Sequence, residues 1–215
     1  MGMNGRISSE SGLTLIELML VVAIIGILTA VGVYNFLAEL PAYRLRGATN
    51  KIAASLQLVK MRAIAKNRSA WLVVNTSNNF FTGFVDEDAD SAIDAPGEYT
   101  EAGMDMPDTF GGTPGFLLPD GVSFGWPSSY GGSGPDGVTP GGDTDGVFVA
   151  GVGMSGKNNI GFRPTGLPVV DLASIRSPTN SVIIFLKNTR DQGFAISIGI
   201  TGRVKTYQWS GGSWQ

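Results

Sequence analysis

Residues 12–33 of the 215-residue chain read GLTLIELMLVVAIIGILTAVGV. The one charged residue in this segment is Glu17, and sixteen uncharged residues follow it up to Val33. As an α-helix rising ~1.5 Å per residue, the stretch from Leu13 to Val33 would be roughly 30 Å long, the thickness of a bilayer's hydrocarbon core. The segment therefore predicts a membrane-spanning helix. A carboxylate near its end is costly without a partner, so Glu17 is a candidate functional residue.

The residues Gly12-Leu13-Thr14-Leu15-Ile16-Glu17-Leu18-Met19 resemble the cleavage signal of type IV prepilins and pseudopilins. The resemblance implies that a prepilin peptidase cuts after Gly12 and that the new N-terminal residue, Leu13, is N-methylated. It also implies that Glu17 pairs with the terminal amine of a neighbouring subunit during filament assembly. The sequence departs from the family pattern at Leu13, where phenylalanine is usual.

Two other interpretations of the apolar run remain open. A plain signal anchor would explain its length, but it gives no reason for a glutamate directly after a glycine at the start of the run. A secretory signal would need a small-residue cleavage site after its apolar core, and this run is long for that purpose. The position of Glu17 favours the prepilin interpretation over both.

The composition limits the chemistry that the chain can perform. There is no cysteine, so a disulfide framework is excluded. There is also no histidine, which removes the commonest general base and the commonest zinc ligand. The 31 glycines amount to about twice the usual fraction and concentrate in the second half, so long loops are expected there.

Charge is strongly segregated along the chain. Residues 1–85 hold eight Lys/Arg and three Asp/Glu, and residues 146–215 hold seven and two, so each of these parts has a net charge of +5. Residues 86–145 hold thirteen Asp/Glu and no Lys/Arg, a net charge of −13. This asymmetry predicts surfaces of opposite sign, suited to head-to-tail contacts between subunits or to a charged ligand.

The helical pattern continues beyond the apolar run to about Asn67. Apolar residues recur there at steps of three and four and form one stripe, namely Leu45, Ala48, Ile52, Leu56, Val59 and Ala63. This stripe should pack on a globular head. Basic residues lie beside the stripe, and we expect them to form a solvated flank, with subunit packing or an anionic partner as the alternative; they are Arg44, Lys51, Arg62 and Lys66.

Strands are expected over most of the remaining chain. A hairpin is predicted from strands 71–74 and 80–85, and further strands are expected over residues 121–126, 146–152, 159–163, 181–186, 194–200 and 203–208. In the segment 194–200, large apolar residues alternate with small ones, which predicts a half-buried strand. Between 126 and 146 the sequence reads as a long flexible loop.

Carboxylates cluster just after the predicted hairpin. Asp86, Asp88, Asp90, Asp94 and Glu98 are candidate Ca²⁺ ligands, since calcium prefers six to eight hard oxygen ligands. The spacing excludes an EF-hand, because Ser91 and Gly97 occupy the positions of its glycine and glutamate. A solvated acidic loop is the favoured interpretation. The segment also resembles an aspartate-rich turn in minor pilins of the FimT/GspH type, with Gly97-Glu98 at its end.

The C-terminal block from NIGFRPTGLP to ITGRVKTYQW resembles the β-region of the same FimT/GspH type. On the last predicted strand, alternation places Arg203, Lys205 and Tyr207 on one face. Cations and an aromatic ring in a row suit a nucleic-acid strand, and the family associates a Gly-Arg-x-Arg stretch here with DNA binding. This sequence has Lys205 in place of the second arginine, so the match is partial. The alternative is an edge strand whose charges guard against aggregation.

Together these features predict an α+β pilin fold. Residues 1–12 form a leader, 13–67 a long helix that is transmembrane over about 13–37, and 68–215 a β-rich head on an antiparallel sheet, with acidic and Gly-rich loops at 86–145. The expected function is that of a minor pilin or pseudopilin without enzymatic activity, in a type IV pilus or a type II secretion pseudopilus. A DNA-uptake pilin and a membrane-anchored enzyme are the alternatives.

The same resemblance sets the expected location and partners. The chain should sit in the bacterial inner membrane with its head in the periplasm, and later in a periplasmic or cell-surface filament. Its expected partners are other pilin subunits, prepilin peptidase, inner-membrane lipid and, in the alternative, DNA. No cofactor is expected apart from the candidate Ca²⁺.

Overall fold

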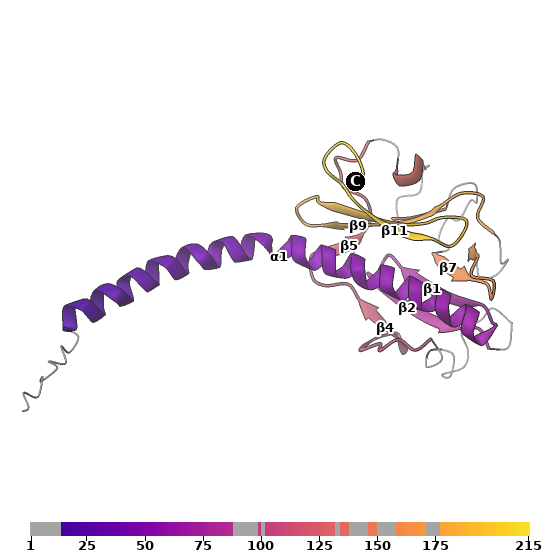
Figure 1. Ribbon diagram of the computed structural model, residues 1–215, viewed down its shortest axis with the longest axis horizontal. Coiled ribbons are helices and arrows are strands. Elements are labelled where there is room, and N and C mark those ends of the chain that lie inside the picture. Colours follow the sequence, from indigo (N-terminus) through magenta and orange to yellow (C-terminus); the bar gives the residue numbers. More distant parts are fainter. Residues whose placement is uncertain are drawn as a thin grey trace, which may run out of the picture. The chain divides into compact units, whose positions relative to one another are not determined.

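The computed structural model describes residues 14–87, 99, 102–131, 134–137, 146–149, 158–170 and 177–215. The chain divides into two compact units, Met1–Leu40 and Pro41–Gln215. Helix α1 (Leu15–Lys66) contributes to both units, and all strands belong to the second unit (Figure 1).

The first unit consists, in its described part, of the N-terminal portion of α1. Its apolar side chains are exposed, and none of the most apolar 18-residue window is buried. By length and composition α1 can cross a membrane, which agrees with the sequence-based expectation.

Helix α1 ends at the position that its sequence predicts. Asn67 adopts a left-handed conformation with φ 54°, which asparagine tolerates better than most residues. The backbone N–H of Arg68 donates to the carbonyl of Ala63 at 3.2 Å, and that of Asn67 donates to Ile64 at 3.3 Å. These two bonds form a Schellman motif, which satisfies carbonyls that the helix end would otherwise leave unpaired.

The second unit contains two antiparallel sheets. One has the strand order β3-β4-β2-β1-β7-β8, and the other has the order β11-β10-β9-β5, with β6 also paired to β9. The strand bounds are β1 Ala70–Asn75, β2 Phe80–Val85, β3 Asp108–Phe110, β4 Thr113–Leu117, β5 Val122–Phe124, β6 Val147–Val149, β7 Asn159–Phe162, β8 Pro168–Val170, β9 Val182–Asn188, β10 Gly193–Ile198 and β11 Val204–Gln208. A 3₁₀ turn, η1 (Pro135–Gly137), lies between β5 and β6.

The predicted hairpin is confirmed. Strands β1 and β2 pair from Ala70 opposite Val85 to Asn75 opposite Phe80. In the turn between them the Asn75 side chain accepts a bond from the backbone N–H of Asn78 at 3.2 Å. Asn79 adopts the left-handed φ of 51° that closes the turn.

Three strands of the first sheet were not expected from the sequence. Strands β3, β4 and β8 are short, and both β4 and β8 contain a proline. Proline and glycine ordinarily indicate a turn rather than a strand, so local sequence gives little sign of them. Strands β3 and β8 are the two edges of the sheet, where proline is tolerated, and β4 lies one strand in from the edge, between β3 and β2.

The expectation that residues 194–200 form a half-buried strand is wrong. On the small-residue face of β10, Ala195 and Ser197 are fully buried. A second apolar cluster covers this face and includes Trp126, Tyr207 and Trp214. The aromatic side chains that cover the sheet come from distant segments, so alternation within β10 could not reveal them.

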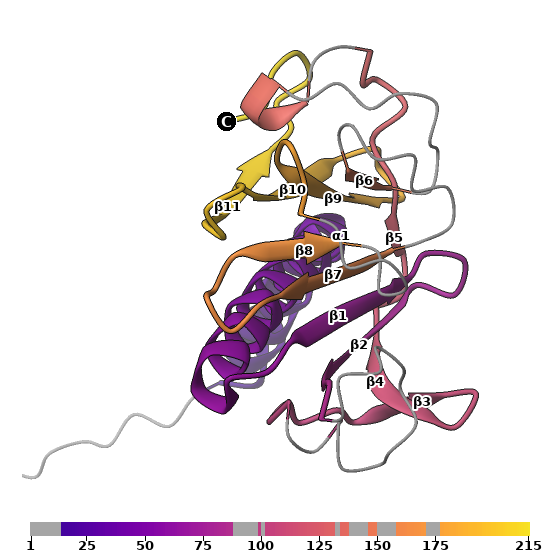
Figure 2. The same ribbon diagram turned by 90° about the vertical axis from the view of Figure 1, so that its right-hand side faces the viewer.

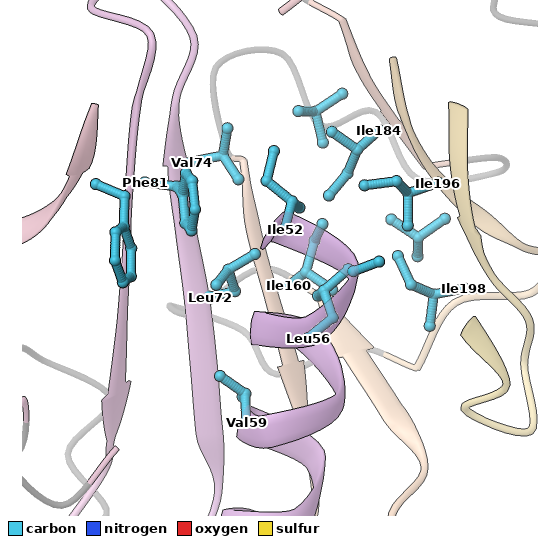
Figure 3. Packing of buried hydrophobic residues seen from close by; sticks show 14 of the residues in the cluster. Ile52, Leu56, Val59, Leu72, Val74, Phe81, Ile160, Ile184, Ile196 and Ile198 are labelled. Carbon is cyan, nitrogen blue, oxygen red and sulfur yellow. The ribbon is translucent and has the colours of Figure 1, made fainter. Parts of the chain in front are cut away.

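The apolar stripe of α1 fills the space between the two sheets (Figures 2 and 3). Its predicted members are all buried and join one core cluster. In this cluster Ile52, Leu56 and Val59 lie against side chains of both sheets, which Figure 3 labels as Leu72, Val74, Phe81, Ile160, Ile184, Ile196 and Ile198. The helix is therefore the common support of both sheets.

Two cations beside this stripe are not simply solvated, contrary to expectation. The Lys51 ammonium lies 3.8 Å from the centre of the Phe116 ring. The Arg44 guanidinium donates to the Asp120 carbonyl at 3.1 Å. The expected flank thus helps to hold strand β4 and the segment that follows it against the helix.

Candidate functional sites on the N-terminal helix and the last strand

The first candidate site is the N-terminus of α1. The side chain of Glu17 accepts hydrogen bonds from the backbone N–H of Thr14 at 2.9 Å and from its hydroxyl at 2.8 Å. The Thr14 hydroxyl oxygen in turn accepts a bond from the backbone N–H of Glu17 at 3.3 Å. This reciprocal arrangement is a capping box, in which two residues satisfy each other's unpaired backbone donors.

The capping box gives Glu17 a partner inside its own chain. The sequence contains the signal for this pair, since Thr14-Leu15-Ile16-Glu17 matches the T-x-x-E capping pattern, which the family resemblance alone does not point to. Gly12 and Leu13, the predicted cleavage site, lie outside the described residues. The structure therefore places the carboxylate at the start of an exposed apolar helix, three residues after Thr14.

The second candidate site lies on strand β11 and involves a residue that sequence reasoning missed. Asp136 accepts hydrogen bonds from the Ser197 hydroxyl at 2.5 Å and the Tyr207 hydroxyl at 2.7 Å. The Lys205 ammonium lies 2.8 Å from the Asp136 carboxylate and also donates to the Tyr207 hydroxyl oxygen at 3.2 Å. Three donors from β10 and β11 thus converge on one carboxylate.

These contacts explain the directions in which the pKa values of the ionisable groups in the cluster are shifted. Partial burial raises the pKa of Asp136, but the hydrogen bonds from Lys205, Ser197 and Tyr207 and the lysine charge outweigh burial and lower it to about 2. The hydrogen bond to Asp136 raises the pKa of Lys205. Burial, followed by the bond to Asp136, raises the pKa of Tyr207. The cluster is therefore an ionised aspartate–lysine pair at neutral pH.

The structure brings the three predicted nucleic-acid-binding residues together only in part. Lys205 and Tyr207 lie on one face, as strand alternation predicts, and both bind Asp136. Arg203 is exposed and lines the same cleft as Lys205 and Asp136. Asp136 comes from the Gly-rich loop, whose sequence gives no sign of a partner on β11. An internal carboxylate thus already binds two of the three predicted residues.

We expect Asp136→Asn to destabilise the second unit at neutral pH by about 1 kcal/mol, a value reduced for the partial exposure of the pair. Because the folded-state pKa lies below the ordinary 3.8, this contribution is present above about pH 4 and is lost as the pH falls toward 2. Urea unfolding at pH 7 and at pH 2.5 measures both effects. The difference between variant and wild type should fall to roughly a third at the lower pH, because the folded-state pKa of about 2 lies just below it. Asp120→Asn, at an exposed carboxylate, is the control and should change stability at pH 7 by less than about 0.5 kcal/mol.

The predicted calcium site falls largely outside the described residues. Asp88, Asp90, Asp94 and Glu98 are among the residues that are not described. Asp86 follows β2 directly, is 3% exposed, and its backbone N–H donates to the Ser69 carbonyl at 2.9 Å. In the described part of the chain no three His, Cys, Asp or Glu side chains lie close enough to hold a metal ion. Calcium binding at the acidic loop stays a prediction.

Comparison with known proteins identifies the N-terminal segment. Residues 7–33 match the family described as the prokaryotic N-terminal methylation motif. A search of curated proteins found no match. The match covers the N-terminal motif alone, 27 of the 215 residues. The fold is the α+β arrangement that the sequence predicts, with one long N-terminal helix packed on antiparallel sheets.

Two kinds of solved structure resemble the chain weakly. One is the minor pseudopilin EpsH from the type 2 secretion system of Vibrio cholerae, with 8% identity, a TM-score of 0.43, and coverage of 79% of this chain and 99% of EpsH. Another is the type IV minor pilin FimU of Pseudomonas aeruginosa, with 12% identity, a TM-score of 0.41, and coverage of 81% of this chain and 94% of FimU. A second structure of EpsH gives a TM-score of 0.43 at 8% identity.

Proposed function

We propose that the protein is a minor pilin or pseudopilin, a non-enzymatic subunit that assembles into a type IV pilus or a type II secretion pseudopilus. The observation that carries this proposal is the N-terminal portion of α1. Its large apolar side chains are exposed from Leu15 to Leu37, over more than five turns, and the capped carboxylate of Glu17 lies in the first turn of this run. Such a surface needs either lipid or other helices around it.

The capping box supports a two-stage role for Glu17. Before assembly, Thr14 supplies hydrogen bonds that reduce the cost of placing a carboxylate at the membrane boundary. After cleavage by prepilin peptidase behind Gly12, the methylated amine of Leu13 on a neighbouring subunit would become the charged partner. A charge pair among apolar helices is worth more than the same pair in water, so it would set the register of the incoming helix.

Orientation and location follow from the same proposal. The single positive charge of the leader, Arg6, would remain in the cytoplasm, and the second unit would lie in the periplasm. Lipid of the inner membrane would surround α1 until the subunit enters the filament.

The enzymatic alternative would use paired carboxylates of the acidic region, most of which lie outside the described residues, so it stays a prediction from the sequence. The described residues offer one other arrangement to consider. Ser197 and Lys205 are directly opposite each other on β10 and β11, a pairing that could indicate a nucleophile and its base. However, Ser197 is 0% exposed and its hydroxyl donates to Asp136. A substrate could not reach this hydroxyl in the described structure.

Nucleic-acid binding stays a prediction from the sequence, with weaker support than assembly. Lys205 and Tyr207 are engaged by Asp136, and two cations are a small electrostatic footprint for a polyanion. Binding through Arg203 would have to show a steep salt dependence that Arg203→Ala removes.

The proposal is tested by the intact mass and N-terminal sequence of the protein, recovered separately from membranes and from sheared surface or periplasmic filaments. We expect a chain that starts at N-methylated Leu13 in the filament fraction. A chain that retains residues 1–12 and occurs only in membranes would contradict both processing and assembly, and would leave a plain membrane anchor.

A further inference from the structure

The second unit exposes apolar side chains where the end of α1 meets two turns. The basic patch, as we name it, consists of Met61, Ile64, Leu167 and Ile200, which are 48–58% exposed, together with the cations Lys60 and Arg203. The Lys60 ammonium donates to the Gly202 carbonyl at 2.9 Å, which ties the β10–β11 turn to the helix.

Close packing makes the basic patch one continuous surface. Gly166, in the β7–β8 turn, has a φ of 77°, and a Cβ there would lie 3.1 Å from Ile64 Cδ1 and 3.2 Å from Lys60 Cε. The turn therefore passes directly against these helix side chains. A Cβ at Gly202, in the β10–β11 turn, would likewise lie 3.1 Å from Lys60 Nζ. Leu167 follows Gly166, and Ile200 precedes Gly202 by two residues, so each turn carries an exposed apolar residue close to a glycine that packs against the helix.

A second exposed apolar surface lies on strands β3 and β4. The acidic patch, as we name it, consists of Phe110, which is 41% exposed, and Leu117, which is 48% exposed, with Asp108 and Asp120 beside them. Leu117 is opposite Phe80 in the β2–β4 register, and the Phe80 and Phe110 rings lie 5.7 Å apart. The two apolar side chains therefore flank Phe80 on one face of the sheet.

Acidic groups border this surface directly. The Asp108 carboxylate accepts a bond from the backbone N–H of Leu117 at 2.9 Å. Asp108, Leu117 and Asp120 line one open cleft of about 630 Å³, and Arg44 also lines it and donates to the Asp120 carbonyl. The two carboxylates outnumber the single cation at this cleft.

The segments of the six-stranded sheet that contribute to the two patches are at opposite ends of its strand order (Figure 2). Strands β3 and β4 are at one end of the strand order, and the β7–β8 turn is at the other. The patches of one chain therefore cannot cover each other. Each combines exposed apolar side chains with charges that are mostly of one sign: among the described residues, Arg44 is the one cation that lines the acidic cleft, and Asp136 is the one carboxylate that lines the cleft of Arg203 and Lys205. The prevailing signs are opposite, as the charge segregation of the whole chain predicts.

We propose that the basic patch of one copy binds the acidic patch of a second copy, so that heads associate head to tail. Because the two surfaces differ, the contact is heterologous and leaves a free patch at each end for another copy. Each surface is small, so the contact should be weak between free heads and populated when heads are held at high local concentration. The inference rests on the proposed assembly function, because assembly is what would hold the heads at such a local concentration.

The absence of cysteine from the chain makes the contact directly testable. Leu117→Cys and Leu167→Cys are introduced into separate full-length chains, which carry tags of different size. Three liposome samples are prepared: one with each variant alone and one with the two variants mixed. A short bismaleimide then links thiols that lie close. We expect a cross-linked pair of the two different chains in the mixture and little product in either single variant.

Charge reversal provides the matched control. Arg203→Glu in the Leu167→Cys chain should reduce the mixed product about tenfold, since it places like charges together, and Asp120→Lys in the other chain should restore it. Arg190→Glu, at an exposed cation of the β9–β10 turn, should leave the yield unchanged. Circular dichroism confirms that each variant is folded.

Several outcomes would overturn the head-to-tail contact. If each single variant cross-links with itself as well as the mixture does, the contact is symmetric or arises from random collision. If the mixture gives no product between the two different chains, the patches do not meet. These results are separable from the proposed function, because they concern heads in liposomes and need no filament. Filament incorporation without this cross-link would contradict the contact and leave the assembly function standing.

Discussion

Glu17→Leu is expected to insert into the membrane normally and to be incorporated into filaments at least about tenfold less than wild type. The leucine removes the only charge of the apolar segment, so insertion becomes easier rather than harder. Incorporation should suffer because the terminal amine of the neighbouring subunit would enter an apolar helix bundle without a counter-charge. Quantitative immunoblots of membrane and sheared-filament fractions measure the two steps separately.

Glu17→Gln separates the charge of this residue from its role in capping the helix. Glutamine preserves the T-x-x-E/Q pattern, so the bonds between Thr14 and residue 17 can persist while the charge is lost. If the charge pair drives assembly, the glutamine variant should fail nearly as badly as the leucine variant. Glu39→Leu, at an exposed carboxylate farther along α1, is the matched control and should assemble. Normal incorporation of Glu17→Gln would mean that Glu17 acts only as a helix cap and that its charge does not drive assembly.

The sequence predicts those parts of the fold that depend on local periodicity. The stripe from Leu45 to Ala63 follows a helical period, and the structure buries all of it. The end of α1 is also local, because asparagine at residue 67 can adopt the left-handed conformation that closes a helix. The β1–β2 hairpin follows from two apolar runs separated by an asparagine-rich turn.

The unexpected features depend on contacts between distant segments. Strand β4 contains Pro114 and Gly115, and it forms because Phe81 and Phe116 stack across β2 and β4 with ring centres 5.0 Å apart. The outer face of β10 is buried because Trp126 and Trp214 reach it from opposite ends of the C-terminal half. Neither relation is encoded in the spacing of neighbouring residues.

The same distinction applies to the candidate sites. The N-terminal site is a local motif, so its residues could be named from the sequence, including a capping pair that the pattern already contained. The site on β11 is formed across 69 residues between Asp136 and Lys205. Sequence alternation could place Lys205 and Tyr207 on one face, but it could not show that an internal carboxylate binds them.

Leu56→Ala is expected to destabilise the second unit by about 3 kcal/mol, within the range for buried leucines. Leu56 is 0% exposed and belongs to the part of the α1 stripe that packs between the two sheets (Figure 3). A truncation there removes contacts with both sheets at once and leaves a cavity that rigid strands on either side cannot easily close. Urea unfolding of residues 41–215, expressed as a separate unit, measures the loss. Gln57→Ala, at the neighbouring exposed position, should change stability by less than about 0.5 kcal/mol.

The four tryptophans allow the two sheets to be followed separately in the same experiment. Trp71 lies on β1 in the first sheet, whereas Trp126 and Trp214 pack against the second sheet. If α1 supports both sheets, the tryptophan fluorescence of a variant that retains only Trp71, and that of a variant that lacks only Trp71, should each give the same urea midpoint as the far-UV circular dichroism of that variant. Leu56→Ala should then shift the fluorescence and circular dichroism midpoints together in both variants. Separate midpoints would mean that each sheet folds around its own contacts. In that case the helix would be packed between the sheets without coupling them.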